Sequence, residues 1–218
     1  MKSILVFGDS NSWGYDYRTY DTATGTVKRL SPEERWPGRV QRELGSEYHI
    51  IENCLNARTN LVDDPFFPLR VGKPSLQVAL DVNAPLDLVI IKLGCNDLKH
   101  MFALSAGMIA GAMEQLVIEA KKSYYGYPTP KILIVSPHPT HPKIGEMAFG
   151  FNFGPEAYGK SMELSKLYGE VAARQGAAFL DSAALNLELN DWDGLHYSVK
   201  DHEKLADAMA KKIKDILG

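Results

Sequence analysis

Five short, largely apolar runs recur along the chain, separated by polar loops and by segments with helical periodicity. Apolar runs of this length predict strands that are covered on both faces. Because helical segments stand between the runs, we expect parallel strands with right-handed crossovers and helices on both sides of the sheet. The predicted strands cover residues 4–7, 48–51, 86–93, 132–135 and 177–180. The pattern thus predicts a single domain over residues 1–218, an α/β fold of three layers (α/β/α) with a five-stranded parallel sheet.

Helices are predicted from capping residues and from apolar residues spaced three or four apart. Ser31-Pro32-Glu33-Glu34 has the pattern of a capping box, which predicts a helix from there to Leu44. A long amphipathic stretch runs from Ser105 to about Ser123, with Met108 on its predicted apolar side. The other predicted helices cover residues 75–82, 155–175 and 198–217.

Two long segments show neither pattern. Residues 15–31 are rich in Thr, Gly and Asp, and residues 136–154 are rich in Pro, His and Phe. Long loops in a compact domain tend to bind ligands or to contact a neighbouring subunit. We expect one of these roles for each segment.

The first strand ends at Gly8-Asp9-Ser10, which is the first candidate for chemistry. Ligands of open parallel sheets bind at the carboxyl ends of the strands. A serine there can act as a nucleophile, with its own amide directed at the developing oxyanion. A small residue that caps a helix is the alternative reading of the same three residues. A phosphate cradle is disfavoured because Asp9 would repel an anion and no Gly-rich fingerprint follows.

Two further polar segments follow later predicted strands. Asn96, in Gly94-Cys95-Asn96-Asp97, carries a neutral amide that can donate to an oxyanion, although Asn-Asp after Gly is also a common turn. In the segment 53–59, the backbone amide near Ala57 is a second candidate donor, and the small side chain would let a substrate approach. Both segments are expected at the same edge of the sheet as Ser10.

The last candidate is Asp193-Gly194-Leu195-His196, which lies shortly before the C-terminal helix. An imidazole in this position can take a proton from Ser10, while Asp193 holds the other ring nitrogen. Capping of the final helix is the alternative. The chain order Ser, Asp, His is one of those known for such triads, although Ser10 is not in a Gly-x-Ser-x-Gly elbow.

Composition narrows the class of protein. The chain is 45% hydrophobic and 23% charged, with a net charge of −3, which argues against a nucleic-acid binder or a membrane-surface protein. No apolar run reaches the length of about 18 residues that a spanning helix needs. The first strand starts after Met1-Lys2-Ser3, which leaves no room for a signal peptide, and two cysteines give no disulfide framework. We therefore expect a cytoplasmic protein.

Taken together, the candidate segments resemble the SGNH hydrolases, the GDSL esterase/lipase superfamily. The resemblance covers the whole chain in spacing and implies a flavodoxin-like sheet. It also implies a triad of Ser10, His196 and Asp193, and an oxyanion hole formed by the Ser10 amide, the Ala57 amide and Asn96. The superfamily usually has Gly where this chain has Ala57. The matching residues are Gly8-Asp9-Ser10-Asn11-Ser12, Gly94-x-Asn96-Asp97 and Asp193-x-x-His196.

One subgroup is the most similar, that of the bacterial arylesterases and the mycobacterial acyltransferase, in which some members have Ala at the position of Ala57. The resemblance to this subgroup implies activity on short-chain esters and a homo-oligomer whose packing narrows the substrate channel. It is based on Trp13-Gly14, Asn53-x-Leu55-x-Ala57-Arg58-Thr59 and Asp63-Asp64-Pro65.

The expected function is that of a serine carboxylic-ester hydrolase acting on acetyl-type esters of small, aryl or sugar alcohols. Acyl transfer to alcohols in water remains an alternative, as does a non-catalytic carbohydrate-binding module on the same fold. Trp13, Leu195 and Phe153 are expected to line the substrate pocket. For Lys99 the default expectation is exposure to solvent, and a position at the pocket rim is the alternative.

No metal and no organic cofactor is expected. His138 and His141 have a spacing that would suit metal ligands, but each precedes a proline and no carboxylate partner is near in sequence. A metal-dependent phosphoesterase is disfavoured because no Asp-x-His follows the first strand. The expected partner is therefore a small ester, with no nucleic acid and no membrane.

Overall fold

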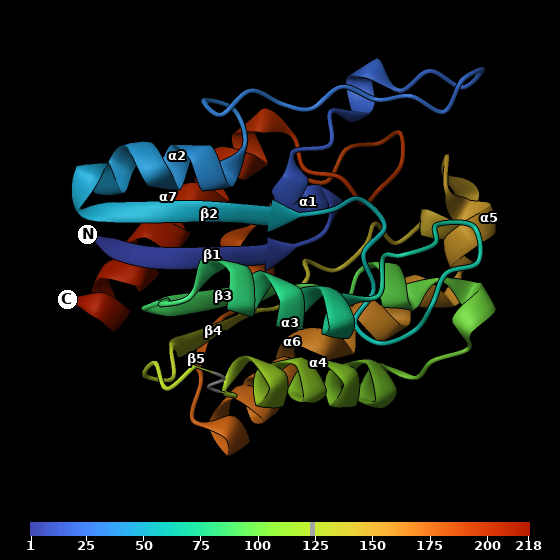
Figure 1. Cartoon of the computed structure of the whole chain (residues 1–218). Coiled ribbons are helices and arrows are strands. Elements are labelled where there is room, and N and C mark those ends of the chain that lie inside the picture. Colours follow the sequence, from blue (N-terminus) through green and yellow to red (C-terminus); the bar gives the residue numbers. More distant parts are fainter. Residues whose placement is uncertain (123–124) are drawn as a thin grey trace.

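Five parallel strands form the central sheet of the computed structural model, which describes residues 1–122 and 125–218 (Figure 1). Their spatial order is β2-β1-β3-β4-β5, the flavodoxin-like order that the resemblance implied. The strands are β1 (Lys2–Gly8), β2 (Tyr48–Cys54), β3 (Leu88–Lys92), β4 (Lys131–Val135) and β5 (Ala178–Leu180). The helices are α1 (Ser10–Trp13), α2 (Trp36–Leu44), α3 (Gly72–Asn83), α4 (Ala106–Ala120), α5 (Gly150–Phe153), α6 (Glu156–Gln175) and α7 (Val199–Leu217).

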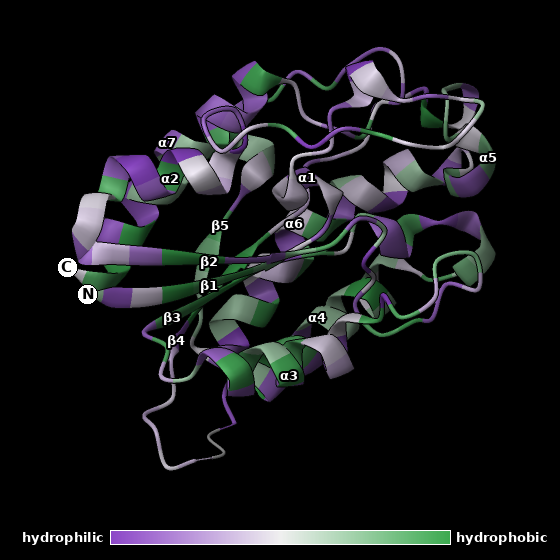
Figure 2. Cartoon of the chain, turned by 45° about the horizontal axis from the view of Figure 1, so that its top comes forward, coloured by the Kyte–Doolittle hydropathy of each residue, from purple (hydrophilic) through white to green (hydrophobic). Residues whose placement is uncertain are grey.

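Helices cover both faces of the sheet, because successive side chains of a strand point to opposite faces. Ile4 and Val6 of β1 pack with α2 and α7, whereas Leu5 and Phe7 pack with α3, α4 and α6. Figure 2 shows the apolar colour concentrated in the sheet and on the inner sides of these helices. Each apolar side chain buried in this way contributes about 1.5–3 kcal/mol, so the two cores hold the strand ends in fixed positions.

The strand order reverses at β1, which has β2 on one side and β3 on the other. Chain segments leaving β1 and β3 therefore diverge, and a crevice opens between them at the carboxyl edge of the sheet. In Figure 1 the short helix α1 and the loops after β2 and β3 all lie at this edge.

Helix α2 begins at Trp36, so the predicted start at Pro32 is wrong. Ser31 and Glu34 form a separate turn, in which the Ser31 N–H donates to the Glu34 carboxylate at 3.0 Å. The reason is Pro37, which has no N–H and is tolerated only in the first turn of a helix. The helix must therefore start just before it.

Helix α4 differs from its prediction in two respects. Ser105 caps it as expected, but Met108 is 58% exposed and does not belong to the buried side of the helix. The predicted end at Ser123 lies outside the described residues. Within the described part of the chain, no helix combines the length and the apolar character that a membrane crossing requires.

Candidate active site

A cavity of about 420 Å³ opens at the carboxyl edge of the sheet, and four of the sequence-derived candidates lie in its wall. Ser10 follows β1, Ala57 follows β2, Asn96 follows β3, and His196 comes from the loop before α7. Four segments that are far apart in the sequence thus meet at the edge where the crevice was expected.

Ser10 is placed by the tight turn between β1 and α1. Asp9 caps the helix through a hydrogen bond that the Asn11 N–H donates at 3.0 Å. Gly8 is required, because a Cβ there would lie 2.4 Å from the Ser12 hydroxyl oxygen. The turn therefore presents Ser10 at the start of a helix, where backbone amides have no partner within the helix.

His196 lies between Ser10 and Asp193. Its Nε2 is 2.9 Å from Ser10 Oγ, and its Nδ1 donates to Asp193 Oδ2 at 2.6 Å. Because a carboxylate only accepts, Nδ1 carries the hydrogen, and Nε2 is left as the acceptor that faces the serine hydroxyl.

Asp193 is fully buried, yet it remains a carboxylate. Burial by itself would raise its pKa, but His196 and the N–H groups of Leu195 and His196 outweigh burial and lower the pKa to about 2. At neutral pH the charge that faces the imidazole is therefore fixed.

Sequence reasoning missed the two asparagines that hold this loop. Asn190 donates to Asp193 Oδ1 at 2.7 Å and to the His196 carbonyl at 2.8 Å. Asn11 donates to the Leu195 carbonyl at 3.0 Å and ties the same loop to α1. Neither asparagine has a chemical role of its own, so only the position of Asn11 next to Ser10 could have drawn attention to it.

Three donors face the region beside Ser10. Among the described residues, the amides of Ser10 and Ala57 donate to no other group. The Asn96 side-chain amide donates one hydrogen to the Arg58 carbonyl at 3.1 Å, which leaves its second hydrogen for the cavity. Ala57 has a φ of 61°, in the left-handed region that favours glycine.

The predicted pocket residues separate into two groups. Leu195 and Phe153 line the cavity, as does Tyr15, which stacks on the imidazole of His196. The structure places Trp13 elsewhere: its ring packs under the guanidinium of Arg29, 5.3 Å away.

Lys99 is buried in the cavity wall, so the default expectation of exposure is wrong and the alternative, a position at the pocket, is closer to the structure. Its ammonium pairs with the buried Asp64 carboxylate at 2.5 Å. A buried lysine needs such a partner, and Asp64 comes from a segment 35 residues earlier in the chain. His138 and His141 belong to no group of three or more potential metal ligands within residues 1–122 and 125–218.

The strand order and the cavity at the carboxyl edge define an SGNH-type hydrolase fold. A family model described as the GDSL-like Lipase/Acylhydrolase family matches residues 6–204. The chain belongs to this family and is an esterase or acylhydrolase. No curated protein matches the chain.

Solved structures resemble the chain over its whole length. Est24, a carbohydrate acetylesterase from Sinorhizobium meliloti, is 36% identical with a TM-score of 0.89, and 100% of each chain is covered. The native M. smegmatis aryl esterase is 34% identical with a TM-score of 0.91 and the same coverage. A carbohydrate acetylesterase family member from Sinorhizobium meliloti is 30% identical, with a TM-score of 0.88 and 100% coverage of each chain.

Proposed function

We propose that the protein is a serine carboxylic-ester hydrolase in which Ser10 is the nucleophile, His196 the general base and Asp193 its orienting carboxylate. The observation that carries this proposal is the position of His196, which is within hydrogen-bond distance of both Ser10 and Asp193 in the cavity wall. This is the contact pattern that activates a serine hydroxyl at neutral pH.

The reaction follows from these contacts in two steps. His196 Nε2 takes the Ser10 proton as Oγ attacks the ester carbonyl, and the amides of Ser10 and Ala57 and the Asn96 side chain hold the resulting oxyanion. The C–O bond to the alcohol then breaks, and His196 returns the proton to the leaving oxygen. Water attacks the acyl-enzyme by the same route and releases the acid and Ser10.

The proposed substrates are short-chain, acetyl-type esters of small, aryl or sugar alcohols. Support comes from the similar structures, which are named an aryl esterase and carbohydrate acetylesterases. Aromatic side chains in the cavity wall, among them Phe149 and Phe153, also suit an aryl group.

Hydrolysis of an aryl acetate tests the proposal. Ser10→Ala is expected to remove nearly all turnover, because it removes the hydroxyl that lies 2.9 Å from His196 Nε2. Ser46→Ala, which removes an exposed hydroxyl on the loop before β2, is the matched control and should behave as the wild type. Full activity of Ser10→Ala would refute the mechanism.

Acyl transfer to an alcohol in water is the second candidate, and one observation favours it. Aromatic rings surround His196: Tyr15 stacks on it, Phe149 meets it edge-on at 6.2 Å, and Trp192 packs against Phe149. Such a wall favours an organic alcohol over water next to the acyl-enzyme. Product analysis after adding an alcohol distinguishes the two. Both reactions release the original alcohol, but transfer places the acyl group on the added alcohol as a new ester, whereas hydrolysis releases it as the acid.

We also propose a single domain that assembles into a homo-oligomer. Large apolar side chains are exposed on two segments that border the cavity: Phe66 is 75% exposed, Leu69 is 90% exposed and Phe151 is 83% exposed. A monomeric mass in solution would contradict the oligomer. A cytoplasmic location is proposed as well, supported by the unpaired thiols of Cys54 and Cys95.

A further inference from the structure

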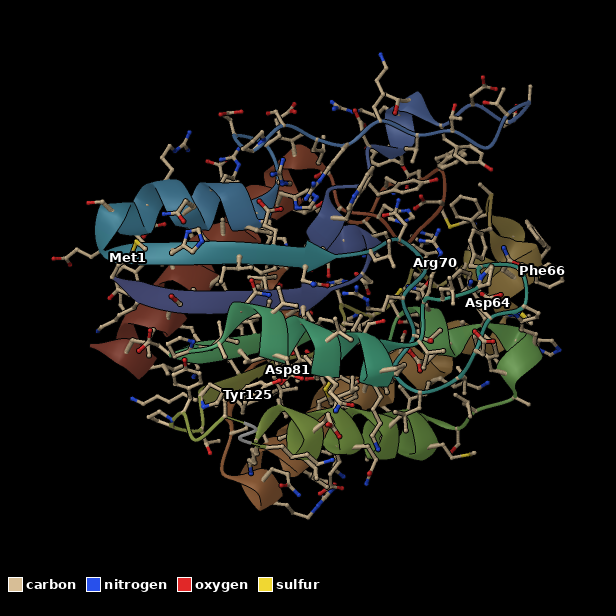
Figure 3. All side chains as sticks on the ribbon, viewed as in Figure 1. Met1, Asp64, Phe66, Arg70, Asp81 and Tyr125 are labelled. Carbon is tan, nitrogen blue, oxygen red and sulfur yellow. The ribbon has the colours of Figure 1, made fainter. Side chains whose placement is uncertain are left out.

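Arg70 contributes a positive charge to the cavity wall, and the part of the chain that the structure describes provides no ion-pair partner for it. It lies on the segment between β2 and α3, at the carboxyl edge of the sheet, with Asp64 and Phe66 earlier on the same segment (Figure 3). Its Nη1 donates to the Asn56 carbonyl at 2.8 Å. Among residues 1–122 and 125–218, no carboxylate lies within the 4.0 Å of an ion pair with its guanidinium.

The two neighbouring cations, Lys99 and Arg58, have partners within the protein. Lys99 is neutralised by Asp64, and Arg58 is buried behind the wall, where it donates to the Gly8 and Asn53 carbonyls. No Asp or Glu is found among the described residues that line the cavity. Arg70 is therefore the cation without an ion-pair partner among the described residues of the cavity wall.

Two of the three guanidinium nitrogens of Arg70 have no acceptor among the described residues. Nε is buried and has no hydrogen-bond partner, and no bond to Nη2 is formed within the described chain. Nε and Nη2 are the two parallel donors with which arginine binds a carboxylate side-on. A buried N–H without an acceptor is unfavourable, so an acceptor from the substrate would be stabilised here.

We propose that the preferred substrates are acetyl esters whose alcohol part carries a carboxylate, which Arg70 binds through Nε and Nη2. The inference rests on the proposed ester hydrolysis at Ser10. The carboxylate belongs to the alcohol part because the acyl group is short. The charge of Arg70 also attracts such an anion to the cavity.

The test compares matched pairs of esters, 3- and 4-acetoxybenzoate against the corresponding acetoxybenzamides. The readout is the ratio of kcat/KM for the acid over that for the amide, because intrinsic reactivity cancels when variants are compared. Arg70→Gln should lower this ratio roughly 10- to 100-fold, the worth of a charged hydrogen bond. Arg70→Lys should retain part of the ratio, since lysine keeps the positive charge but lacks the two parallel N–H donors.

Arg42→Gln is the control, since it removes an exposed arginine near the end of α2 and should leave the ratio at the wild-type value. Thermal unfolding confirms that each variant is folded. An unchanged ratio in Arg70→Gln, with both esters still hydrolysed, would overturn the inference and leave the proposed function standing. An equal loss on the acid, the amide and a neutral sugar acetate would also overturn it. Failure of the wild type on every ester would overturn both proposals.

Discussion

The ring of Tyr15 lies parallel to the imidazole of His196, with 3.9 Å between the ring centroids and 13° between the planes. Tyr15 is buried, and it belongs to the segment 15–31 that has no helix or strand pattern. The stack fixes the plane of the imidazole, so that Nε2 faces Ser10 while Nδ1 faces Asp193. An aromatic face also stabilises the imidazolium that forms in the proposed reaction.

The first prediction concerns Tyr15 as a positioning residue. Tyr15→Leu should lower kcat about tenfold, because the imidazolium loses a partner worth on the order of 1–2 kcal/mol in a desolvated site. Tyr15→Phe keeps the ring and should remain within a few-fold of the wild type. The loss in Tyr15→Leu should fall on kcat with a smaller effect on KM, because the ring acts on the imidazole and not on the bound ester. An equal loss in Tyr15→Phe, or an effect on KM alone, would contradict this role.

The second prediction concerns Asn96, whose free amide hydrogen faces the cavity. Asn96→Ala should lower kcat roughly 10²- to 10³-fold with a smaller effect on KM, because the donor acts on the oxyanion and not on the bound ester. Asn83→Ala is the matched control: Asn83 also donates to one carbonyl, that of Ala79, but it ends α3. Equal turnover in both variants would show that Asn96 does not stabilise the oxyanion.

The common location of the segments that follow the strands could be predicted from the sequence, because the carboxyl ends of parallel strands lie at one edge of the sheet. Ser10 and Asn96 each follow a continuous apolar run, so their common edge followed from the predicted sheet, and the flavodoxin-like order is confirmed. The structure also brings His196 to Ser10, although 186 residues separate them.

What the sequence did not reveal lies in segments without periodicity. Tyr15 and Arg70 reach the cavity from loops whose paths are set by long-range contacts, and a hydropathy pattern contains no information about those paths. Lys99 was expected in solvent because a charged side chain is exposed by default. Its burial depends on Asp64, a partner that no local pattern identifies.

The third prediction concerns the backbone at Ala57. With a φ of 61°, alanine is strained there by about 1–2 kcal/mol, whereas glycine is not. Ala57→Gly should therefore raise the free energy of unfolding by roughly 0.5–1 kcal/mol, after the greater flexibility of the unfolded chain is subtracted. Ala103→Gly is the control, because Ala103 also has a positive φ, 49°, and does not line the cavity. Thermal unfolding should show a higher unfolding temperature for both variants. A lower unfolding temperature for Ala57→Gly alone would contradict backbone strain at Ala57.

The fourth prediction concerns Asp97, a buried carboxyl next to Asn96. Both of its oxygens accept from the Asn60 N–H, at 3.0 and 3.1 Å, but burial dominates and raises its pKa to about 7. In the unfolded chain this pKa is about 3.9. Between these two values the folded state binds the extra proton, so the free energy of unfolding falls as the pH rises, by at most about 1.4 kcal/mol per pH unit.

The variant Asp97→Asn isolates this contribution, because the amide has the shape of the carboxyl group and does not titrate. Denaturant unfolding at pH 4 to 8 should show that wild-type stability declines more steeply than that of Asp97→Asn up to about pH 7, with parallel curves above it. Asp193, whose pKa is about 2, loses its stabilising contribution as the pH falls below about 5, but both proteins contain it, so this contribution cancels in the comparison. Asp215→Asn, at an exposed position on α7, should reproduce the wild-type slope. Parallel curves over the whole range would mean that Asp97 is already ionised in the folded protein at pH 4.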